Sequence, residues 1–230
     1  MTLGQFPLSP PKGMEFHTFD GSKARDTTQA GTFSGTLGMS IKLRAASPDD
    51  ASDIARLIDI AGDGLPCAIW SDLARPNQTA IEAGASLIRK DTTAFTWRRA
   101  RVAESEGEIA GLLISHDTGL EPEQITETTH PALRPLIKLE NTVPKTRCIS
   151  ILATFPEYRR GGVARALMQD AETRPGEEGM SLVTAAENFA GRKFYTSLGY
   201  REAGEAPMVL GTHGPVGKTW LLMRKRTRLH

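Results

Sequence analysis

The feature that most restricts the fold of this chain is the stretch of residues 151–168, ILATFPEYRRGGVARALM. Its first residues are apolar and predict a strand, which Pro156 interrupts. Two arginines and two glycines follow at positions 159–162, and an amphipathic helix begins after them, with Val163 and Leu167 on its inner face. The sequence therefore predicts a strand that passes through a tight turn directly into a helix.

The physical chemistry of this turn favours the binding of an anion. The first backbone N–H groups of a helix have no intrahelical acceptor, and they lie at the positive end of the helix dipole. Glycine lets an anion approach the backbone closely, and arginine adds charge-assisted hydrogen bonds. The same glycines would also suit a turn that binds nothing, so the turn alone leaves both interpretations open.

The remaining apolar patterns predict a mixed α/β domain. Alternating apolar and polar residues predict strands, and apolar residues spaced by three and four predict helices. A turn at 105–107 joins two of the strands into a hairpin. We expect strands at residues 41–44, 101–104, 109–114, 149–154, 181–186, 200–202 and 218–224, and helices at 48–61, 78–89, 129–138, 162–172 and 189–198.

The composition of the chain changes near residue 40. Residues 1–40 are rich in Gly, Ser, Thr and Pro and have no sustained apolar period, so they bury too little apolar surface to offset the entropy of ordering. We expect a flexible extension at 1–40, a folded domain at 41–226 and a basic tail at 227–230. The extension could instead wrap around the domain or a partner subunit.

Charge and hydropathy exclude two classes of partner. The formal net charge is +1, whereas a nucleic-acid-binding domain usually carries a clear basic excess. No apolar run approaches the roughly 20 residues that span a bilayer, and the N-terminus lacks a secretory signal. We therefore expect a cytoplasmic protein with no nucleic-acid or membrane partner.

Cysteine and histidine spacing gives no metal motif. The two cysteines, Cys67 and Cys148, are far apart, and none of the five histidines has metal-ligand spacing to another. The sequence therefore predicts neither a structural disulfide framework nor a bound metal.

Three blocks of the sequence resemble the GNAT acyltransferase superfamily. Arg159, Gly162 and Ala164 match its acyl-CoA pyrophosphate signature, which reads Q or R, x, x, G, x, G or A. Residues 187–200, ENFAGRKFYTSLGY, are similar to a second family block, with Gly191 where alanine is usual. The hairpin at 102–111 resembles the second and third strands of the family, so the resemblance covers about residues 41–224.

The resemblance implies a fold and a cofactor. The fold would be the GNAT fold of the α/β (α+β) class, a mixed, mostly antiparallel sheet of six to seven strands flanked by about four helices. The cofactor would be acetyl-CoA as co-substrate, without a metal. The strand before the turn would splay from its neighbour and bind the pantetheine arm, and the turn would hold the pyrophosphate. The residues implied in these two roles are Leu152, Ala153, Thr154, Arg159, Arg160, Gly161, Gly162, Val163 and Ala164.

The resemblance also implies catalytic roles. Asn188 would help to hold the CoA arm, and Tyr195 would protonate the departing thiolate, a role that suits a phenol of pKa near 10. Gly191 in place of alanine would slightly weaken the helix and loosen its packing. The alternative for Tyr195 is a purely structural aromatic on that helix.

Direct attack on acetyl-CoA requires a neutral amine, so a general base is expected. Glu140 is the first candidate, because it follows the helix at 129–138 and precedes the cofactor strand. Glu187 and His116, each at the end of a strand, are the second and third candidates. Glu140 could instead be an ordinary solvated carboxylate.

Together these features predict an N-acetyltransferase that acts on a primary amine of a small molecule or peptide. A homodimer is possible, because dimers are common in the superfamily. The alternative is a non-catalytic module of the same fold that binds acyl-CoA without turnover.

Overall fold

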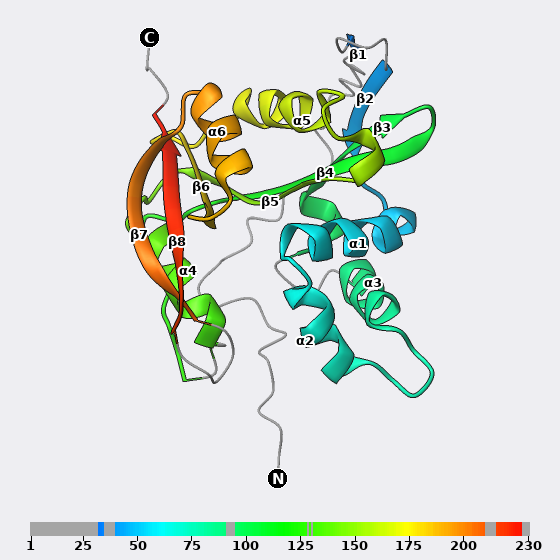
Figure 1. Ribbon diagram of the computed structural model, residues 1–230, viewed down its shortest axis with the longest axis horizontal. Coiled ribbons are helices and arrows are strands. Elements are labelled where there is room, and N and C mark those ends of the chain that lie inside the picture. Colours follow the sequence, from blue (N-terminus) through cyan, green and yellow to red (C-terminus); the bar gives the residue numbers. More distant parts are fainter. Residues whose placement is uncertain are drawn as a thin grey trace, which may run out of the picture. The chain divides into compact units, whose positions relative to one another are not determined.

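The computed structural model describes residues 32–34, 40–90, 95–127, 129, 131–209 and 215–226, which form two compact units (Figure 1). Of the described residues, unit 1 contains 115–150 and 170–226, and unit 2 contains 32–114 and 151–169. The three boundaries fall inside two neighbouring strands, at 114/115 and 150/151, and inside one helix, at 169/170, so each of these elements contributes to both units.

Unit 2 is built on a meander of antiparallel strands. The strands β1 (Thr32–Ser34), β2 (Ser40–Ala45), β3 (Ala100–Ser105) and β4 (Glu108–Asp117) pair in that order. Glu106 and Gly107 connect β3 to β4, and both have positive φ, as a two-residue hairpin turn requires. The first residues of β4 lie next to the last residues of β5 (Arg147–Thr154), and Phe155 N–H donates to Ala110 O at 3.0 Å.

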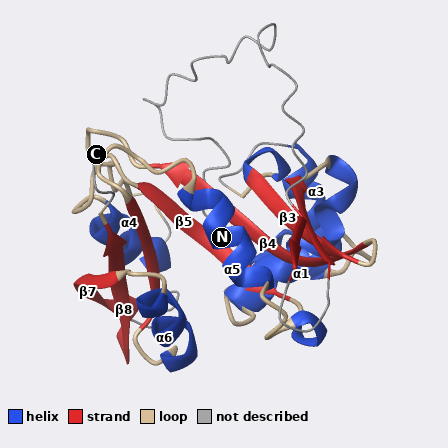
Figure 2. Cartoon of the chain, turned by 90° about the horizontal axis from the view of Figure 1, so that it is seen from above, coloured by secondary structure: helices blue, strands red, loops and turns tan. Residues whose placement is uncertain are grey.

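Three helices pack beside these strands and complete the core of unit 2 (Figure 2). They are α1 (Ala51–Ala61), α2 (Leu65–Leu73) and α3 (Ala80–Lys90). Their apolar faces share one cluster with β3, β4 and β5, in which Ile54, Leu57 and Val102 have no exposed surface. Trp70 of α2 packs so closely on Gly84 of α3 that a Cβ there would lie 2.5 Å from its ring.

An ion-pair network fixes the start of α1. Arg44 of β2 donates to both carboxylate oxygens of Asp50, at 2.7 and 2.9 Å, and it also pairs with Glu104 of β3. Asp50 in turn accepts from the backbone N–H of Ser47, which closes the capping box expected of a serine three residues before an acid. The Arg44 guanidinium holds the pKa of the Asp50 carboxyl below its usual value.

Unit 1 contains the other part of the sheet. Its strands lie in the order β4, β5, β6 (Met180–Ala185), β8 (Pro215–Lys225) and β7 (Arg201–Val209). β6 pairs with β8 and β8 with β7 in antiparallel fashion, whereas β5 and β6 are parallel. Leu139 of α4 (Arg134–Glu140) packs on Leu222 of β8 with Val143.

Two further helices follow the strands that carry the sequence motifs. The helix α5 (Val163–Glu172) begins in unit 2 and ends in unit 1, and α6 (Phe189–Ser197) belongs to unit 1. Gly199, with φ of 94°, ends α6 as the sequence predicts. Among the described residues no helix is both long and apolar enough to span a membrane.

The predicted fold class is confirmed, with several corrections to individual elements. All seven expected strands are present, and an eighth, β1, forms within the stretch expected to be a flexible extension. Six α-helices occur among the described residues, one of which, α2, has no counterpart in the sequence prediction. Most of the extension (residues 1–31 and 35–39) and the tail at 227–230 lie outside the described residues.

Candidate functional site

The turn at 159–164 has the backbone geometry of an anion-binding loop. Arg160 and Gly162 both have positive φ, of 64° and 90°. The backbone therefore alternates between negative and positive φ before α5 begins. Such alternation turns successive N–H groups toward one side. The first i→i−4 bond of the helix runs from Ala166 N–H to Gly162 O, and the N–H groups of Val163 and Ala164 precede it. These are the groups that the sequence predicts to bind an anion.

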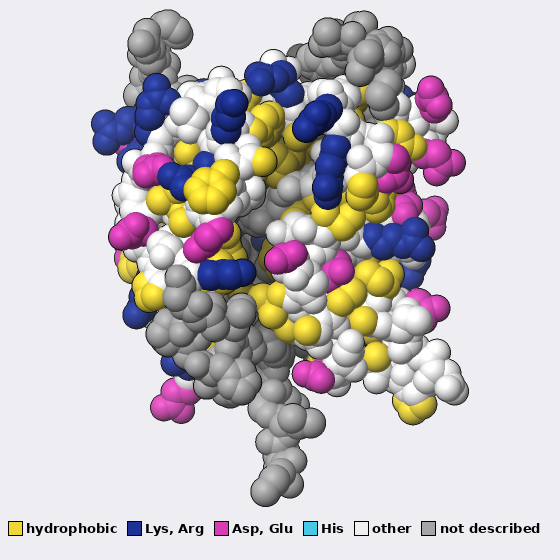
Figure 3. All heavy atoms as spheres, in the orientation of Figure 1, with side chains coloured by type: hydrophobic (Ala, Val, Ile, Leu, Met, Phe, Trp, Pro, Cys, Tyr) yellow, Lys and Arg dark blue, Asp and Glu magenta, His cyan; other side chains and the backbone are white. Residues whose placement is uncertain are grey.

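Basic side chains surround this turn. Arg159, Arg160 and Arg165 are all exposed. Figure 3 shows Lys and Arg side chains gathered over α5 and the turn that leads into it. The Arg159 side chain folds back so that its Nε lies 3.5 Å from the Thr154 carbonyl oxygen, at the end of β5. The turn therefore offers both backbone donors and positive charge on an accessible surface.

Close packing behind the turn fixes the position of α5. A Cβ on Gly111 of β4 would lie 2.6 Å from Val163 Cγ1 and 2.8 Å from Ala153 O. Both contacts are shorter than any ordinary Cβ contact, so only glycine permits α5 to sit this close to β4 and β5. The hairpin motif includes this glycine, but its packing role is apparent only once β4, β5 and α5 are placed together.

The β5 strand leaves its parallel neighbour after three residues. The register pairs join Arg147, Cys148 and Ile149 to Met180, Ser181 and Leu182, and Ser150 has no register partner in β6. This is the divergence that the resemblance implies for the cofactor strand. Further along β5, the Thr154 hydroxyl is buried without a hydrogen-bond partner among the described residues. The Thr154 hydroxyl is thus a polar group on β5 that could accept or donate a hydrogen bond to a ligand.

At the start of α6, Asn188 has a structural role. Its Oδ1 accepts from Gly191 N–H at 3.0 Å, which caps the helix, and its Nδ2 donates to Thr184 Oγ1 at 3.2 Å. A Cβ on Gly191 would lie 2.5 Å from this amide. The expectation that glycine loosens the helix here is therefore corrected, because the glycine makes room for the cap. Binding of CoA by Asn188 stays a prediction.

Tyr195 lies on α6 among other aromatic rings. Its ring centroid is 5.4 Å from that of Phe194 and 6.2 Å from that of Tyr200. Burial raises the pKa of Tyr195 to about 12, so its hydroxyl is protonated at neutral pH. Tyr200 has no exposed surface, whereas Tyr195 is only half-buried, which makes Tyr195 the better placed of the two to meet a ligand.

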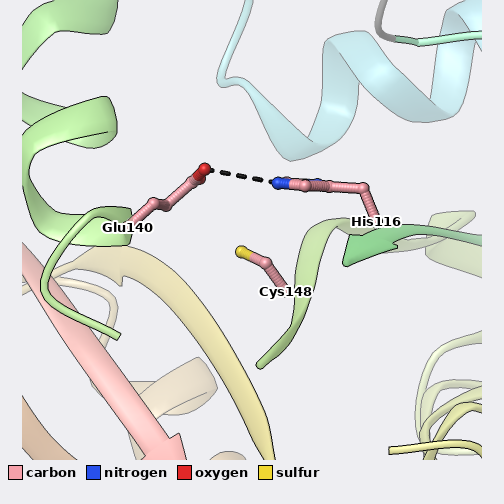
Figure 4. Close-up of side chains that lie close together, drawn as sticks. All are labelled: His116, Glu140 and Cys148. Atoms are coloured by element: carbon pink, nitrogen blue, oxygen red, sulfur yellow. Dashed lines mark ion pairs between the residues drawn. The ribbon is translucent and has the colours of Figure 1, made fainter. Parts of the chain in front are cut away.

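Unit 1 brings together two of the three candidate bases. His116, near the end of β4, points its Nε2 toward the Glu140 carboxylate at the end of α4, at 3.4 Å (Figure 4). Its Nδ1 lies 2.8 Å from Ser150 Oγ on β5. The His116 and Glu140 side chains are 23% and 21% exposed, so solvent reaches both groups. The third candidate, Glu187, lies exposed in the loop before α6.

Cys148 is the third member of this group. It belongs to β5, is 1% exposed, and its Sγ lies within 4.8 Å of the facing atoms of His116 and Glu140 (Figure 4). Burial, and then the Glu140 carboxylate, raise the pKa of the Cys148 thiol well above its usual value. Neither Ser150 nor the approach of Cys148 was predicted from the sequence, although the adjacency of β4 and β5 could have indicated both.

The comparisons with known proteins agree with this fold. Residues 96–202 match the acetyltransferase (GNAT) domain. Among solved structures, an N-acetyltransferase from Staphylococcus aureus Mu50 has a TM-score of 0.56 and 21% identity, over 79% of this chain and 98% of that chain. A second acetyltransferase has a TM-score of 0.57 and 19% identity, over 80% of this chain and 98% of that chain.

A third structure is named for the same family. It is an acetyltransferase of the GNAT family from Bacillus cereus, with a TM-score of 0.50 and 14% identity, over 83% of this chain and 99% of that chain. A search of curated proteins found no match. At these identities the solved structures show the fold, and the domain match covers residues 96–202.

Residues 96–202 match the acetyltransferase (GNAT) domain and the fold is that of solved acetyltransferases, so the resemblance based on the three sequence blocks is confirmed. The activity that this family supports is acetyl transfer.

Proposed function

We propose that this chain is an N-acetyltransferase that moves an acetyl group from acetyl-CoA to a primary amine of a small molecule or peptide. The observation that carries the proposal is the turn at 159–164. It combines two residues of positive φ, exposed arginines and the start of α5 in the position where the family signature places the pyrophosphate.

Several groups fit acetyl-CoA as the donor. The N–H groups of residues 162–164 and the arginines would hold the pyrophosphate. Leu152, Ala153 and Thr154 would bind the pantetheine arm, and the unpartnered Thr154 hydroxyl supports this assignment because a buried hydroxyl without a partner costs free energy. One amide hydrogen of Asn188 is left after the Thr184 contact, and it could donate to the same arm.

The reaction proceeds by direct attack in a ternary complex. The neutral amine nitrogen attacks the thioester carbonyl carbon, the new C–N bond forms, and the C–S bond breaks. The departing CoA sulfur takes a proton from the Tyr195 hydroxyl, which is protonated at neutral pH, and Tyr195 then regains a proton from solvent. The nitrogen loses its proton to Glu140, whose carboxylate is half-buried beside His116. Backbone donors on β5 would stabilise the oxyanion that develops in between.

The catalytic role of Tyr195 can be tested with a hydroxyl deletion. We expect Tyr195→Phe to lower kcat by about 10²–10⁴, the usual contribution of a positioned general acid. The Kd of acetyl-CoA should change little, because the pyrophosphate contacts lie elsewhere. Release of free CoA with a panel of amines gives kcat, and calorimetry gives Kd.

The matched control is Tyr200→Phe, which removes a hydroxyl from the neighbouring ring that has no exposed surface. This variant should keep its kcat. An unchanged kcat in Tyr195→Phe would remove that residue from the mechanism. If the wild-type chain binds acetyl-CoA but releases no CoA with any amine, the chain is a binding module and not an enzyme.

A further inference from the structure

The group formed by His116, Glu140 and Cys148 combines three kinds of metal ligand. An imidazole nitrogen, a carboxylate oxygen and a sulfur are the three donor types that zinc uses in proteins. They come from three elements of unit 1, namely β4, α4 and β5, and all three ligand atoms lie within 4.8 Å of one another. Figure 4 shows the imidazole and the carboxylate directed at each other, with the thiol beside them.

The distances are close to those of a tetrahedral site. Zinc bonds of about 2.0 Å to nitrogen or oxygen and about 2.3 Å to sulfur place neighbouring ligand atoms about 3.3–3.6 Å apart. His116 Nε2 and Glu140 Oε2, at 3.4 Å, are already within that range. The 4.8 Å limit on the other pairs leaves only small side-chain rotations before all three atoms could reach one ion.

The surroundings of the group resemble the support that metal ligands usually have. A ligating histidine commonly uses its second nitrogen in a hydrogen bond that fixes the ring. Here His116 Nδ1 lies 2.8 Å from Ser150 Oγ, which leaves Nε2 directed at Glu140. The Glu123 carboxylate is close enough to Glu140 that their charges raise its pKa, after the effect of burial.

We propose that His116, Glu140 and Cys148 form a binding site for a single divalent ion of the zinc class. His116 Nε2, one Glu140 oxygen and Cys148 Sγ are the three protein ligands, and water takes the fourth position. On binding, the sulfur–hydrogen bond of Cys148 breaks, the metal–sulfur bond forms, and the proton goes to solvent. The sequence did not predict this site, because its three ligands are far apart along the chain and come together only in the fold.

Cobalt titration tests the site directly. Co²⁺ added to the metal-free full-length protein should bind at one ion per chain and give a thiolate-to-cobalt charge-transfer band. The band should disappear in Cys148→Ser and persist in Cys67→Ser, since Cys67 lies in unit 2 beside Asp59. His116→Ala and Glu140→Gln should weaken binding by at least about tenfold.

Two controls keep the result interpretable. Circular dichroism shows whether Cys148→Ser folds, and Ser150→Ala supplies a milder variant that keeps all three ligands and should weaken binding by about 10–100-fold. A wild-type protein that gives no charge-transfer band overturns the proposal. A band that survives Cys148→Ser, or that is lost in Cys67→Ser, overturns it as well.

The site has a consequence for catalysis that rests on the proposed function. A carboxylate bound to a metal cannot accept the proton of the amine, so zinc should inhibit acetyl transfer if Glu140 is the base. Excess chelator should restore the rate. Because cobalt binding is measured without activity, loss of the metal site and loss of the base role give different results: binding without inhibition removes only the base role of Glu140.

Discussion

Asn188 and Gly191 depend on each other at the start of α6. The amide of Asn188 folds over the first turn of the helix and occupies the place where a Cβ of residue 191 would lie. Glycine lowers the stability of the helix relative to alanine, and the Asn188 cap stabilises the helix by about 1 kcal/mol. A departure from the family pattern at one residue is thus explained by the side chain three positions earlier.

Asp50 illustrates how one ion pair ties stability to pH. Its folded pKa lies below the unfolded value, so its contribution is fully present above the unfolded pKa of about 3.9 and is lost as pH falls through the folded pKa. We expect Asp50→Asn to lower the free energy of unfolding by about 1–3 kcal/mol at pH 7. Chemical denaturation at pH 7 and below pH 4 measures this.

The neighbouring Asp49→Asn is the matched control, because Asp49 is exposed. The difference in stability between wild type and Asp50→Asn should shrink below pH 4, whereas Asp49→Asn should differ little from wild type at either pH. If Asp50→Asn and Asp49→Asn behave alike, the network with Arg44 does not stabilise the start of α1.

At the scale of elements, the pairing of β4, β5 and α5 decides where the turn lies. Gly111 is the contact point, since Val163 and the Ala153 carbonyl occupy the space of its missing side chain. We expect Gly111→Ala to lower stability by about 1–3 kcal/mol, as overpacking of a core does. It should also weaken acetyl-CoA binding, because α5 must move. Thermal unfolding and calorimetry measure the two effects.

Gly204 of β7 provides the comparison for this change. A Cβ there would have its nearest neighbour at 3.6 Å, which is an ordinary contact. Gly204→Ala should therefore leave stability within about 0.5 kcal/mol and leave binding unchanged. Equal effects of the two alanines would contradict the role given to Gly111.

The elements that were predicted from the sequence differ from those that were missed in the regularity of their apolar pattern. Strands and helices with a clear local apolar pattern, such as β3, β4 and α1, were predicted to within a few residues. The α2 helix was missed because LPCAIWSDL has apolar residues on several faces and a proline near its start. The β7 strand was predicted too short because glycine and proline interrupt it.

At the scale of the whole molecule, the order of elements and the cofactor turn were accessible from the sequence because their signals are local. The cluster of His116, Glu140, Cys148 and Ser150 was not, because it depends on which strands become neighbours. Glu140 and His116 were named separately as bases, and only the fold brought them to 3.4 Å. The acceptor amine leaves no comparable local signal in the sequence.

The proposed function requires that the turn at 159–164 bind the pyrophosphate of acetyl-CoA. Calorimetric titration of acetyl-CoA into wild type, Gly162→Ala and Gly107→Ala tests it most directly. Both glycines have positive φ, of 90° and 86°, so both substitutions add similar backbone strain. A Cβ on Gly162 would have its nearest neighbour at 3.9 Å, and a Cβ on Gly107 would have none within 4 Å, so neither causes a clash. Only Gly162 lies in the turn at 159–164, whereas Gly107 lies in the hairpin turn between β3 and β4.

We predict that wild type and Gly107→Ala bind one acetyl-CoA per chain with equal affinity. Gly162→Ala should bind at least about tenfold more weakly, a loss of about 1.4 kcal/mol. A wild-type chain that does not bind acetyl-CoA, or a Gly162→Ala variant that binds it as tightly as wild type, would contradict the role of this turn in binding the pyrophosphate.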